Sequence, residues 1–466
     1  MDVLLINPNE RLSVLEDSLK VPPLGLAYIA AILEENKYQV KIVDLTVENV
    51  EDEILINQIK RFEPKIIGLT CMTPFVSRVK ELAEKLKRDF EVIIVVGGPH
   101  ATALPENLIN NEYIDFVIYA EGEYSFLKLA DSIIRKRIPI EQVQGIIYKR
   151  NKEFIKAKSI PYIKNLDSLP FPARHLLPMD KYSLPHSNAE KITSILTTRG
   201  CPYNCVYCDY KFLMGDKIRT TSPKRVVDEI EYCLKNFSID YFNFRDSTFT
   251  LNENRVHKIC NEIIKRKLNI RWDCTARTNL VTQRMLNEMK KAGCELVSFG
   301  IESGSQKILD WANKKITLEQ SYNAVKMAKR AKLNTLCYFV LGLPPETKET
   351  AKKTIKFAIK LNPDYASFGL VTPFPGTPLF DYAINKNLIK FDKNQDYIFK
   401  SLFNDPILLT KNFTKKELVN TLRWAYLRFY FRLGYILKKL SKIRSVGDFK
   451  KNVNGLIMLL NQVENS

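Results

Sequence analysis

The chain of 466 residues contains no uninterrupted apolar stretch of the ~20 residues that a membrane-spanning helix needs. Its start, Met1–Pro8, is a short apolar run with no basic segment before it, so no secretory signal is expected. The nine cysteines are few and irregularly spaced, which excludes the dense disulfide framework of small secreted domains. From these absences we expect a cytoplasmic protein.

The first 140 residues also lack the glycine-rich sequences of nucleotide-binding proteins. Neither GxGxxG nor GxxxxGKS/T occurs there, which argues against dinucleotide and P-loop binding. Apolar runs instead alternate with amphipathic stretches, which is typical of a parallel sheet with helices on both faces. The expected strands are Val3–Asn7, Gln39–Asp44, Ile66–Thr70, Val92–Gly97 and Phe116–Ala120. We therefore expect a Rossmann-like α/β domain over residues 1–140.

In a sheet of this kind, ligands bind beyond the carboxyl ends of the strands. The loops expected at those ends contain small and polar residues, and glycine allows a close approach of the backbone to a ligand. The candidate cofactor-binding residues in these loops are Thr70, Gly97, Gly98, His100, Glu121 and Gly122. For His100, a hydrogen bond to a cofactor tail or to the backbone is favoured over metal ligation.

A second strand–helix series follows a proline-rich stretch. Residues 141–190 are expected to be a linker, because they contain five scattered prolines and no clear periodicity. Residues 191–400 contain six strand–helix units, which predicts a partial (β/α)6 barrel. Functional groups in such barrels gather at the carboxyl ends of the strands. Residues 401–466 are expected to form a mainly helical, basic C-terminal segment.

Three cysteines follow the first strand of the expected barrel. Cys201, Cys205 and Cys208 have CxxxCxxC spacing, one thiolate short of the four that usually hold an iron–sulfur cube. Three irons can be held by this loop, which leaves the fourth iron open to another ligand. The alternative is a structural zinc loop, but zinc sites usually have a second cysteine or histidine pair, and none is present.

Polar and glycine residues also follow the other expected barrel strands. The segments concerned are Phe244–Phe249, Ala276–Asn279, Phe299–Ser305, Leu341–Thr347 and Thr372–Pro378. One such loop is weak evidence, because loops are generally rich in glycine and polar residues. Five of them at the same end of successive strands, together with the cysteine loop, indicate one site at the mouth of the barrel.

These segments resemble the cobalamin-binding (class B) radical S-adenosylmethionine (radical SAM) enzymes, over residues 1 to about 400. The resemblance implies that Cys201, Cys205 and Cys208 ligate a 4Fe-4S cluster and that Tyr207 packs beside it. It also implies that the sheet domain binds cobalamin. The residues that it implies for S-adenosylmethionine or cofactor binding in the barrel are Asp246, Arg277, Glu302 and Ser303.

The chemical properties of two of these side chains suit that assignment, and one departure counts against the resemblance. Arg277 can grip a carboxylate with two N–H groups, and Glu302 can accept two ribose hydroxyls. The alternative for Glu302 is a surface carboxylate that caps the next helix.

Many corrinoid proteins carry a DxHxxG cobalt-ligand loop, whereas this chain reads Asn7-Pro8-Asn9-Glu10 at that place. Bound cobalamin is therefore expected to lack a protein imidazole ligand.

The resemblance implies a methyltransferase that acts on an unactivated carbon through a 5′-deoxyadenosyl radical. A cyclase or rearrangement enzyme of the same architecture, and a non-catalytic iron–sulfur or cobalamin protein, remain as alternatives. The expected partners are a small-molecule or lipid-like substrate and an electron donor of the ferredoxin or flavodoxin type.

The net charge of +19 is concentrated near the C-terminus. Residues 411–451 contain twelve Lys and Arg against Glu417 and Asp448, and residues 424–440 are aromatic and basic with a helical period. Such a helix can lie on an anionic membrane surface. Packing of its apolar side against the barrel is slightly favoured. No nucleic-acid partner is expected, because no known binding motif accompanies the basic residues.

Overall fold

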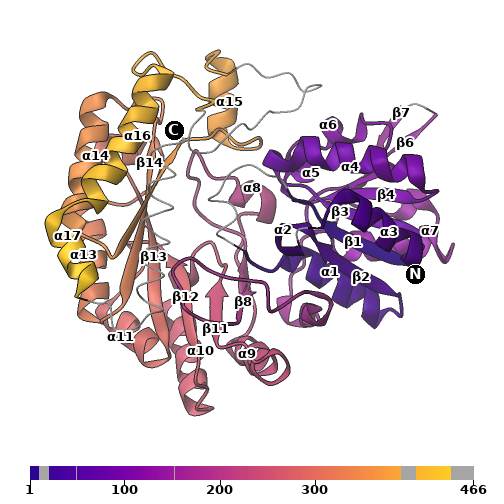
Figure 1. Cartoon of the computed structure of the whole chain (residues 1–466), viewed down its shortest axis with the longest axis horizontal. Coiled ribbons are helices and arrows are strands. Elements are labelled where there is room, and N and C mark those ends of the chain that lie inside the picture. The colour runs from indigo at the N-terminus through magenta and orange to yellow at the C-terminus, as the bar shows by residue number, and fades with distance from the viewer. Residues whose placement is uncertain (10–19, 49, 152, 390–405, 442–466) are drawn as a thin grey trace.

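The computed structural model describes residues 1–9, 20–48, 50–151, 153–389 and 406–441. These residues form two α/β units that lie side by side, the N-terminal unit at the right of Figure 1 and the second unit at the left. The expected α/β class is confirmed in both units.

The N-terminal unit is built on a sheet of seven strands in the order β2-β1-β3-β4-β5-β6-β7. The five strands from β1 to β5 are parallel, and β6 and β7 are antiparallel. Their bounds are β1 Val3–Asn7, β2 Val40–Asp44, β3 Ile66–Thr70, β4 Ile93–Gly97, β5 Phe116–Ile118, β6 Ile146–Arg150 and β7 Glu153–Lys156.

Both faces of this sheet are buried, which explains the continuous apolar runs of its strands. In β1, Val3 and Leu5 belong to one hydrophobic cluster, whereas Leu4 and Ile6 belong to another on the opposite face. One face is covered by α1 and α7, which pack against each other, and the other by α3, α4, α5 and α6. The helix bounds are α1 Leu24–Glu35, α2 Leu45–Glu48, α3 Asp52–Phe62, α4 Val76–Asp89, α5 Pro99–Ala103, α6 Pro105–Ile109 and α7 Glu123–Ile133.

The segment 141–190 is more than the linker that the sequence predicts. Strands β6 and β7 extend the first sheet beyond β5, so the N-terminal unit continues past residue 140. These two short strands pair as a hairpin at the open side of β5, which would otherwise be an unpaired edge. The rest of the segment contacts both units: the hydroxyl of Tyr182 donates to Asp44 at 2.8 Å, and Arg174 donates to Glu229 of α9 (Pro223–Phe237) at 2.7 Å.

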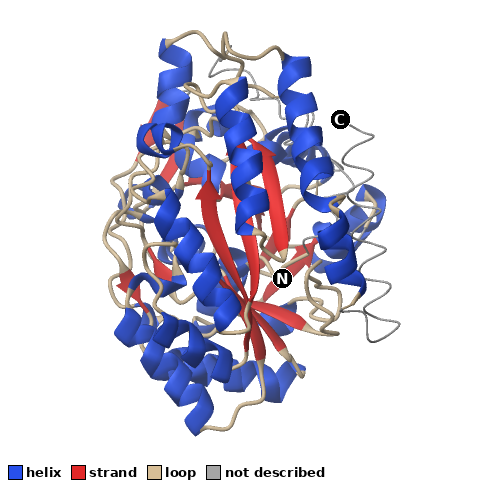
Figure 2. Ribbon diagram, turned by 90° about the vertical axis from the view of Figure 1, so that its left-hand side faces the viewer, coloured by secondary structure: helices blue, strands red, loops and turns tan. Residues whose placement is uncertain are grey.

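The second unit confirms the expected partial barrel. Its six parallel strands follow the order β15-β14-β13-β12-β11-β8, so β8 and β15 are the open edges. Figure 2 shows these strands with helices along the outside of the sheet. The strand bounds are β8 Ile192–Ile195, β11 Tyr241–Phe244, β12 Arg271–Ala276, β13 Cys294–Glu302, β14 Asn334–Leu341 and β15 Tyr365–Leu370.

The helices of this unit begin at sequence signals that satisfy free backbone N–H groups. Ser222 caps α9, and Thr317 and Thr347 form capping boxes at the starts of α13 and α14. Their apolar faces pack on the outside of the barrel sheet in the larger hydrophobic cluster. The helix bounds are α8 Tyr210–Met214, α9 Pro223–Phe237, α10 Glu253–Lys265, α11 Gln283–Lys291, α12 Gln306–Trp311, α13 Leu318–Arg330, α14 Lys348–Leu361 and α15 Pro378–Asn385.

The C-terminal segment packs on the barrel, as the favoured interpretation of its sequence predicts. Helix α16 (Lys415–Tyr430) lies against β15, and α17 (Leu433–Leu440) follows it. Two basic residues of this segment contact the barrel: Arg432 donates to the carbonyl of Ile359 at 3.1 Å, and Lys439 lies over the ring of Tyr365. Among the described residues, no helix is long and apolar enough to cross a membrane.

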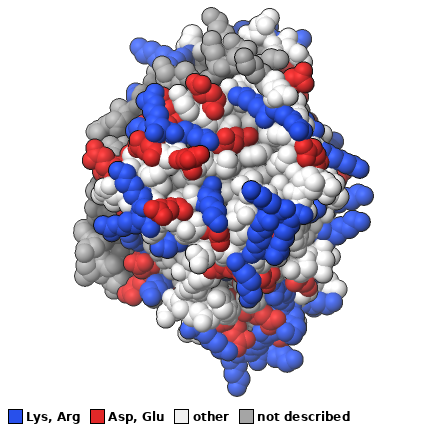
Figure 3. Space-filling view, turned by 90° about the vertical axis from the view of Figure 1, so that its right-hand side faces the viewer, with Lys and Arg blue, Asp and Glu red and all other residues white. Residues whose placement is uncertain are grey.

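Charged side chains of both signs are distributed over the face of the N-terminal unit. Figure 3 shows Lys and Arg interspersed with Asp and Glu there, with no large area of one sign. Ion pairs within the N-terminal unit include Arg88 with Glu84 and Lys87 with Asp115. The positive excess of the chain is therefore not gathered on this face.

Candidate active site

The three-cysteine loop begins after β8 and is fixed by a short hairpin. Strands β9 (Thr198–Arg199) and β10 (Arg219–Thr220) pair antiparallel on either side of the loop. Gly200 has a left-handed φ of 91°, and a Cβ there would lie 2.2 Å from the carbonyl oxygen of Lys217. The next residue, Cys201, donates its N–H to the carbonyl of Gly215 at 3.0 Å. Only glycine fits this entry to the loop.

The middle of the loop is held by residues from the far side of the barrel mouth. The N–H of Val206 donates to the carbonyl of Ala312 at 3.1 Å, and the carbonyl of Val206 accepts from Leu379 at 2.8 Å. The amide of Asn313 donates to the carbonyl of Asn204 at 2.8 Å. Ala312 and Asn313 follow α12, and Leu379 lies in the first turn of α15, so two separate segments of the second unit hold the loop.

The three thiols suit an iron–sulfur cluster better than a zinc ion. Cys201, Cys205 and Cys208 are all free, and they range from buried at Cys205 to exposed at Cys208. A zinc ion needs four donors within about 2.3 Å of one centre, whereas the cysteines of a cube each bind a different iron. The donor set therefore fits a 4Fe-4S cluster with one open iron.

Asp246 lies beneath the entry to the loop and holds its backbone. One carboxylate oxygen accepts the N–H groups of Thr197 at 2.6 Å and Thr198 at 2.8 Å, and the other accepts the Thr197 hydroxyl. The side chain is buried, and burial raises the pKa of its carboxyl. Asp246 thus holds the backbone at the entry to the cysteine loop, and its assignment to cofactor binding stays a prediction.

Arg277 lies against the cysteine loop at the end of β12. Its Nη1 is 3.8 Å from the Sγ of Cys205, and its guanidinium carbon lies 3.6 Å from the centre of the Tyr203 ring. The same guanidinium donates to the carbonyl of Lys314, while its Nε has no partner among the described residues. A buried cation with a spare donor, next to the predicted cluster, fits an anionic ligand group.

Glu302 is buried at the end of β13, which excludes the surface-cap alternative. Its Oε1 accepts from the Nζ of Lys314 at 2.6 Å, and its backbone has a left-handed φ of 65°. Ser303 is also buried, and its hydroxyl lies 3.1 Å from the hydroxyl of Thr354. Lys314 thus connects Glu302 to Arg277, and the structure brings these two predicted residues to one side of the cysteine loop.

Tyr207 packs between the loop and this polar group. The Nζ of Lys314 lies 6.0 Å from the centre of its ring. Its hydroxyl is buried and has no hydrogen-bond partner among the described residues. Burial, followed by the charge of Glu302, raises the pKa of Tyr207 well above its ordinary value. The hydroxyl is therefore a neutral hydrogen-bonding group beside Glu302.

The candidate cobalamin-binding residues lie at one edge of the first sheet. The parallel register places the carboxyl ends of β3 and β4 side by side, with Thr70 opposite Gly97. Gly98 has a φ of 102°, and a Cβ there would lie 2.9 Å from the hydroxyl oxygen of Thr70. Glycine is needed at this position because the chain after β4 passes close to Thr70 and to the backbone of Cys71.

His100 is not placed to bind cobalt. It is fully buried, with Nδ1 3.3 Å from the hydroxyl of Thr73 and Nε2 3.2 Å from the amide oxygen of Asn107. Both ring nitrogens are therefore engaged within the protein. Its role in the structure is to fix the loop that follows β3 to the helices that follow β4.

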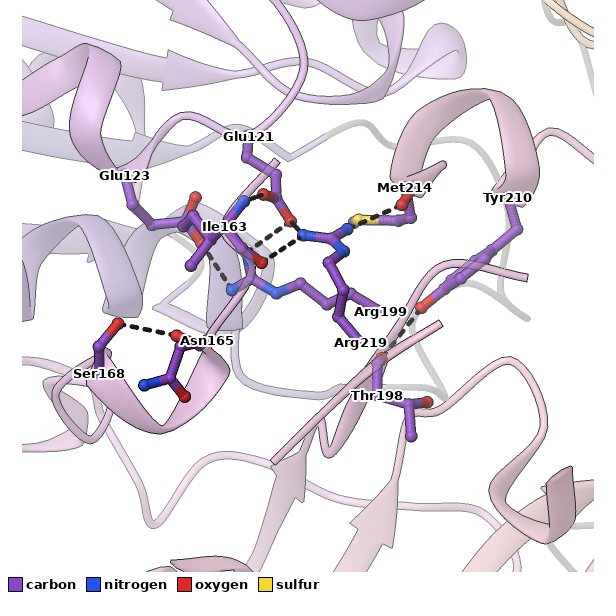
Figure 4. A network of polar contacts seen from close by, with 10 residues as sticks. All are labelled: Glu121, Glu123, Ile163, Asn165, Ser168, Thr198, Arg199, Tyr210, Met214 and Arg219. Atoms are coloured by element: carbon purple, nitrogen blue, oxygen red, sulfur yellow. Dashed lines mark hydrogen bonds and ion pairs between the residues drawn. The ribbon is translucent and has the colours of Figure 1, made fainter. Parts of the chain in front are cut away.

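The carboxylate of Glu121 contacts two arginines of the second unit. The distances are 3.0 Å to Arg199 and 2.7 Å to Arg219, and Glu123 contacts Arg199 at 2.6 Å (Figure 4). The assignment of Glu121 to cofactor binding stays a prediction, and the structure adds that this carboxylate is held by two arginines. Gly122, between the two glutamates, stays at the carboxyl edge of the sheet, where a Cβ would lie 3.4 Å from the side chain of Ile29.

Sequence reasoning missed several residues of this site. They are the two arginines of the hairpin, the aromatic ring over Arg277 and the lysine between Arg277 and Glu302: Arg199, Arg219, Tyr203 and Lys314. Arg199 and Tyr203 are each two residues from Cys201, so their closeness to the cysteine motif could have identified them as candidate site residues. Lys314 follows a short helix without any motif, and only the folded structure shows its place.

Family models match both units of the chain. The model of the radical SAM superfamily matches residues 195–358, and the model of the B12 binding domain matches residues 11–130. An uncharacterized methyltransferase of Pyrococcus horikoshii is 37% identical over 95% of this chain and 94% of its own length. An anaerobic magnesium-protoporphyrin IX monomethyl ester cyclase of Rubrivivax gelatinosus is 30% identical over 94% of this chain and 78% of the cyclase.

Two solved structures share the fold. The radical S-adenosylmethionine methyltransferase TsrM from Kitasatospora setae, with cobalamin and a 4Fe-4S cluster bound, superposes with a TM-score of 0.69 at 20% identity. That alignment covers 84% of this chain and 76% of TsrM. The cobalamin-dependent S-adenosylmethionine radical enzyme OxsB superposes with a TM-score of 0.74 at 19% identity, over 99% of this chain and 71% of OxsB. At these identities the comparison bears on the fold alone.

Proposed function

Since the chain belongs to the cobalamin-dependent radical SAM enzymes, we propose that it transfers a methyl group to an unactivated carbon of its substrate. The cofactors of this family are a 4Fe-4S cluster, S-adenosylmethionine and cobalamin. The relative with 37% identity is named a methyltransferase, which supports the proposal.

The chemistry in this proposal is divided between the cofactors and the protein. When bound, the cluster and the corrinoid supply the electron that cleaves S-adenosylmethionine and the carrier of the methyl group. Cys201, Cys205 and Cys208 would hold the cluster, and the carboxyl edge of the first sheet, with Thr70, Gly97, Gly98 and Gly122, would hold cobalamin. The protein contributes position, charge and exclusion of water.

The polar residues beside the cysteine loop would bind S-adenosylmethionine. Arg277 has a spare N–H for a carboxylate, and Glu302 and the Tyr207 hydroxyl offer hydrogen-bonding oxygens for a ribose. The Lys314 ammonium holds the Glu302 carboxylate in place at 2.6 Å. Ser303 supports the same loop from behind through Thr354, so we assign it a positioning role.

The observation that carries the proposal is the position of the cysteine loop relative to the first sheet. Helix α8, which follows Cys208 directly, packs against α5, which follows Gly98 (Figure 1). The loop that would hold the cluster and the sheet edge that would hold cobalamin are therefore joined by neighbouring helices, which supports the proposal. An enzyme that moves a methyl group between two cofactors and a substrate needs this arrangement, because reacting atoms must approach to about 3–3.5 Å.

A cyclase is the second candidate, because a relative with 30% identity over most of both chains is named as one. Both candidates use the same cofactors, so product mass separates them. A methyltransferase adds one methyl group to the substrate, whereas a rearrangement or ring closure adds none. A non-catalytic iron–sulfur or cobalamin protein would produce no 5′-deoxyadenosine at all.

We further propose a small-molecule or lipid-like substrate and a ferredoxin or flavodoxin type of electron donor.

We also propose that residues 411–451 make peripheral contact with a membrane. The support for this contact in the described part of the segment is a group of exposed apolar side chains: Trp424, Leu427, Phe431, Leu433 and Leu437. Sedimentation with vesicles of anionic phospholipid tests it, and unchanged sedimentation after deletion of 411–466 would exclude contact through this segment.

The decisive experiment for the methyltransferase proposal begins with anaerobic purification and reconstitution with iron, sulfide and hydroxocobalamin. About four irons and one cobalt per chain are expected after removal of the excess. The loaded protein is then reduced with S-adenosylmethionine, and S-adenosylhomocysteine and 5′-deoxyadenosine are measured. Formation of both products is expected. 5′-Deoxyadenosine without S-adenosylhomocysteine would favour the cyclase.

A further inference from the structure

A buried network of four charged side chains joins the two units next to the cysteine loop. Glu121 and Glu123 flank the start of α7 in the N-terminal unit, and Arg199 and Arg219 come from the hairpin of the second unit (Figure 4). The exposed fractions of these side chains are only 4%, 7%, 5% and 9%, in that order. Two positive and two negative charges leave the network neutral, which a buried group of charges requires.

The network is extended by further contacts on both sides. Arg219 also donates to the carbonyls of Ile163 at 3.0 Å and Met214 at 2.8 Å, so it reaches α8, the helix after Cys208. The ring centre of Tyr28, on α1, lies 5.4 Å from the guanidinium of Arg199. Burial lowers the pKa of Arg199, but the charges of Glu123 and Glu121 more than offset this effect, so the pKa is raised. The arginine therefore stays charged.

Both ends of the network lie at functional loops. Arg199 is separated from Cys201 by one residue, and Gly200 between them has no room for a side chain. Glu121 and Glu123 enclose Gly122, at the carboxyl edge of the first sheet. The charged pairs thus connect the cysteine loop with the carboxyl edge of the first sheet in two ways. One runs through Arg199 to Glu121 and Glu123, and the other through Arg219 to Glu121.

Buried ion pairs contribute little net stability, because their desolvation offsets their attraction, but they fix relative positions and register. A network that only held the units together could lie anywhere along their interface. This network lies between the two loops, so it fixes the position of one loop relative to the other. Rotation or sliding of one unit against the other would break its charge-assisted hydrogen bonds.

We propose that the Glu121–Arg199–Glu123 and Glu121–Arg219 pairs form a strut that sets the distance between the cluster and cobalamin. This inference rests on the proposed function, since it assigns these residues to the geometry of that site. They are positioning residues, because they touch neither substrate nor reacting atoms. The strut matters for methyl transfer from S-adenosylmethionine to the corrinoid, which spans both units. It does not matter for reductive cleavage, which needs the barrel alone.

The test uses a charge-balanced double variant, Glu123→Gln with Arg199→Gln, in the full-length protein loaded with both cofactors. It removes one path of the strut and leaves Glu121 paired with Arg219, so no unpaired charge is buried. The single variant Glu123→Gln, which keeps Arg199 paired with Glu121, serves if the double variant does not fold. The matched control is Glu141→Gln with Arg150→Gln, an exposed ion pair of 2.6 Å on the same N-terminal unit.

The first measurement is the distance between the two metal centres. The reduced cluster and cobalamin in its cobalt(II) state are both paramagnetic, so pulsed electron paramagnetic resonance gives a distance distribution. A narrow distribution is expected for the wild type and the control, and a broader or displaced one for the strut variant. An unchanged distribution in a strut variant with full iron and cobalt content would overturn the proposal.

The second measurement is the ratio of two products that need no knowledge of the substrate. In the strut variant, S-adenosylhomocysteine formation is expected to fall about tenfold or more, because displacements near 1 Å can cost up to about 100-fold. 5′-Deoxyadenosine formation should stay within about twofold of wild type. An equal fall of both products would overturn the proposal. If the wild type forms no S-adenosylhomocysteine although its distance distribution responds to the variant, the strut stands and the methyltransferase proposal fails.

Discussion

The guanidinium of Arg277 lies against the sulfur of Cys205, with 3.8 Å between Nη1 and Sγ. The arginine is held there from its other side by the ring of Tyr203, and the pair is buried. A cation beside one of the three thiols that would hold the cluster acts on the charge of that cluster. In iron–sulfur proteins, hydrogen bonds to the sulfurs and local charge set the reduction potential.

Replacement of Arg277 by methionine is therefore expected to lower the midpoint potential of the cluster. Reduction adds a negative charge, and the variant lacks the cation that stabilises it. Arg277→Lys keeps the positive charge but replaces the planar guanidinium by a compact ammonium, so it should give an intermediate potential. The measurement is a redox titration followed by electron paramagnetic resonance. Lys315→Met, an exposed charge change nearby, is the control. Equal potentials in all four proteins would contradict the expectation.

The cluster assignment predicts a different response from two cysteines. Cys205→Ala is expected to reduce iron from ~4 per chain to near zero and to abolish 5′-deoxyadenosine formation. Cys233→Ala is the matched control, because Cys233 lies buried on α9, within the hydrophobic cluster and outside the loop. It should retain iron and turnover. Loss of iron from both variants would indicate general unfolding and would not support the assignment.

The ion pair between Lys314 and Glu302 predicts strong coupling between the two side chains. Both are 9% exposed, so Lys314→Met leaves a buried carboxylate without its partner. Loss of one member of a buried pair costs about 3–5 kcal/mol of unfolding free energy. The double variant with Glu302→Gln should recover part of that loss. Unfolding midpoints of the wild type, both single variants and the double variant measure it, and simple additivity would argue against a direct pair.

The sequence was sufficient to predict the two α/β units because both sheets are mostly parallel. Strands buried on both faces appear as continuous apolar runs, and the observed β1 and β3 have the expected bounds. The hairpin of β6 and β7 was missed because these strands are short, exposed on one side and close to a proline-rich stretch. Their pairing depends on the open side of β5, which no local pattern reveals.

The site was predictable in part for a related reason. In a parallel sheet, successive strands end at one edge, so Arg277 and Glu302 were expected to come together, and Lys314 now joins them. The partner of a charged side chain cannot be read from one sequence. Glu121 was assigned to a cofactor because of its loop, whereas its contacts are set by two arginines about 80 and 100 residues away.

Glu346 predicts a dependence of stability on pH. Its carboxyl is fully buried after β14, accepts the N–H of Gly342 at 2.6 Å through one oxygen, and has no partner for the other among the described residues. Burial raises its pKa to about 8. The folded chain then holds a proton that the unfolded chain releases near pH 4.3, so the contribution of this group is fully present below that pH.

Between about pH 4.5 and pH 8, the contribution of Glu346 to the unfolding free energy should fall by about 1.4 kcal/mol for each pH unit. Above pH 8 it should level off. Glu346→Gln cannot ionise and should lack this component. The measurement is the difference in unfolding midpoint between the two proteins from pH 5 to pH 9. A difference that does not vary with pH would show that the carboxyl is ionised in the folded protein.

The last prediction concerns the open edge of the barrel at β15. The hydroxyl of Tyr430 donates to the carbonyl of Ala366 at 2.6 Å and accepts its N–H at 3.0 Å. Tyr426 makes the same two contacts with Phe368, at 2.8 and 3.1 Å. An edge strand exposes backbone groups that have no neighbouring strand, and unprotected edges pair with other chains. The two hydroxyls therefore replace a missing strand.

The double variant Tyr426→Phe with Tyr430→Phe removes these partners and keeps the aromatic packing. Each lost hydrogen bond contributes about 1 kcal/mol, so a loss of a few kcal/mol in all is expected. Hydrogen exchange at the amides of Ala366 and Phe368 should accelerate, while exchange in the central strand β12 should not. Trp424→Phe, on the exposed side of the same helix, is the control and should leave both unchanged. Unaltered protection of the β15 amides in the double variant would mean that water or another group satisfies this edge, and that α16 is held by its apolar contacts alone.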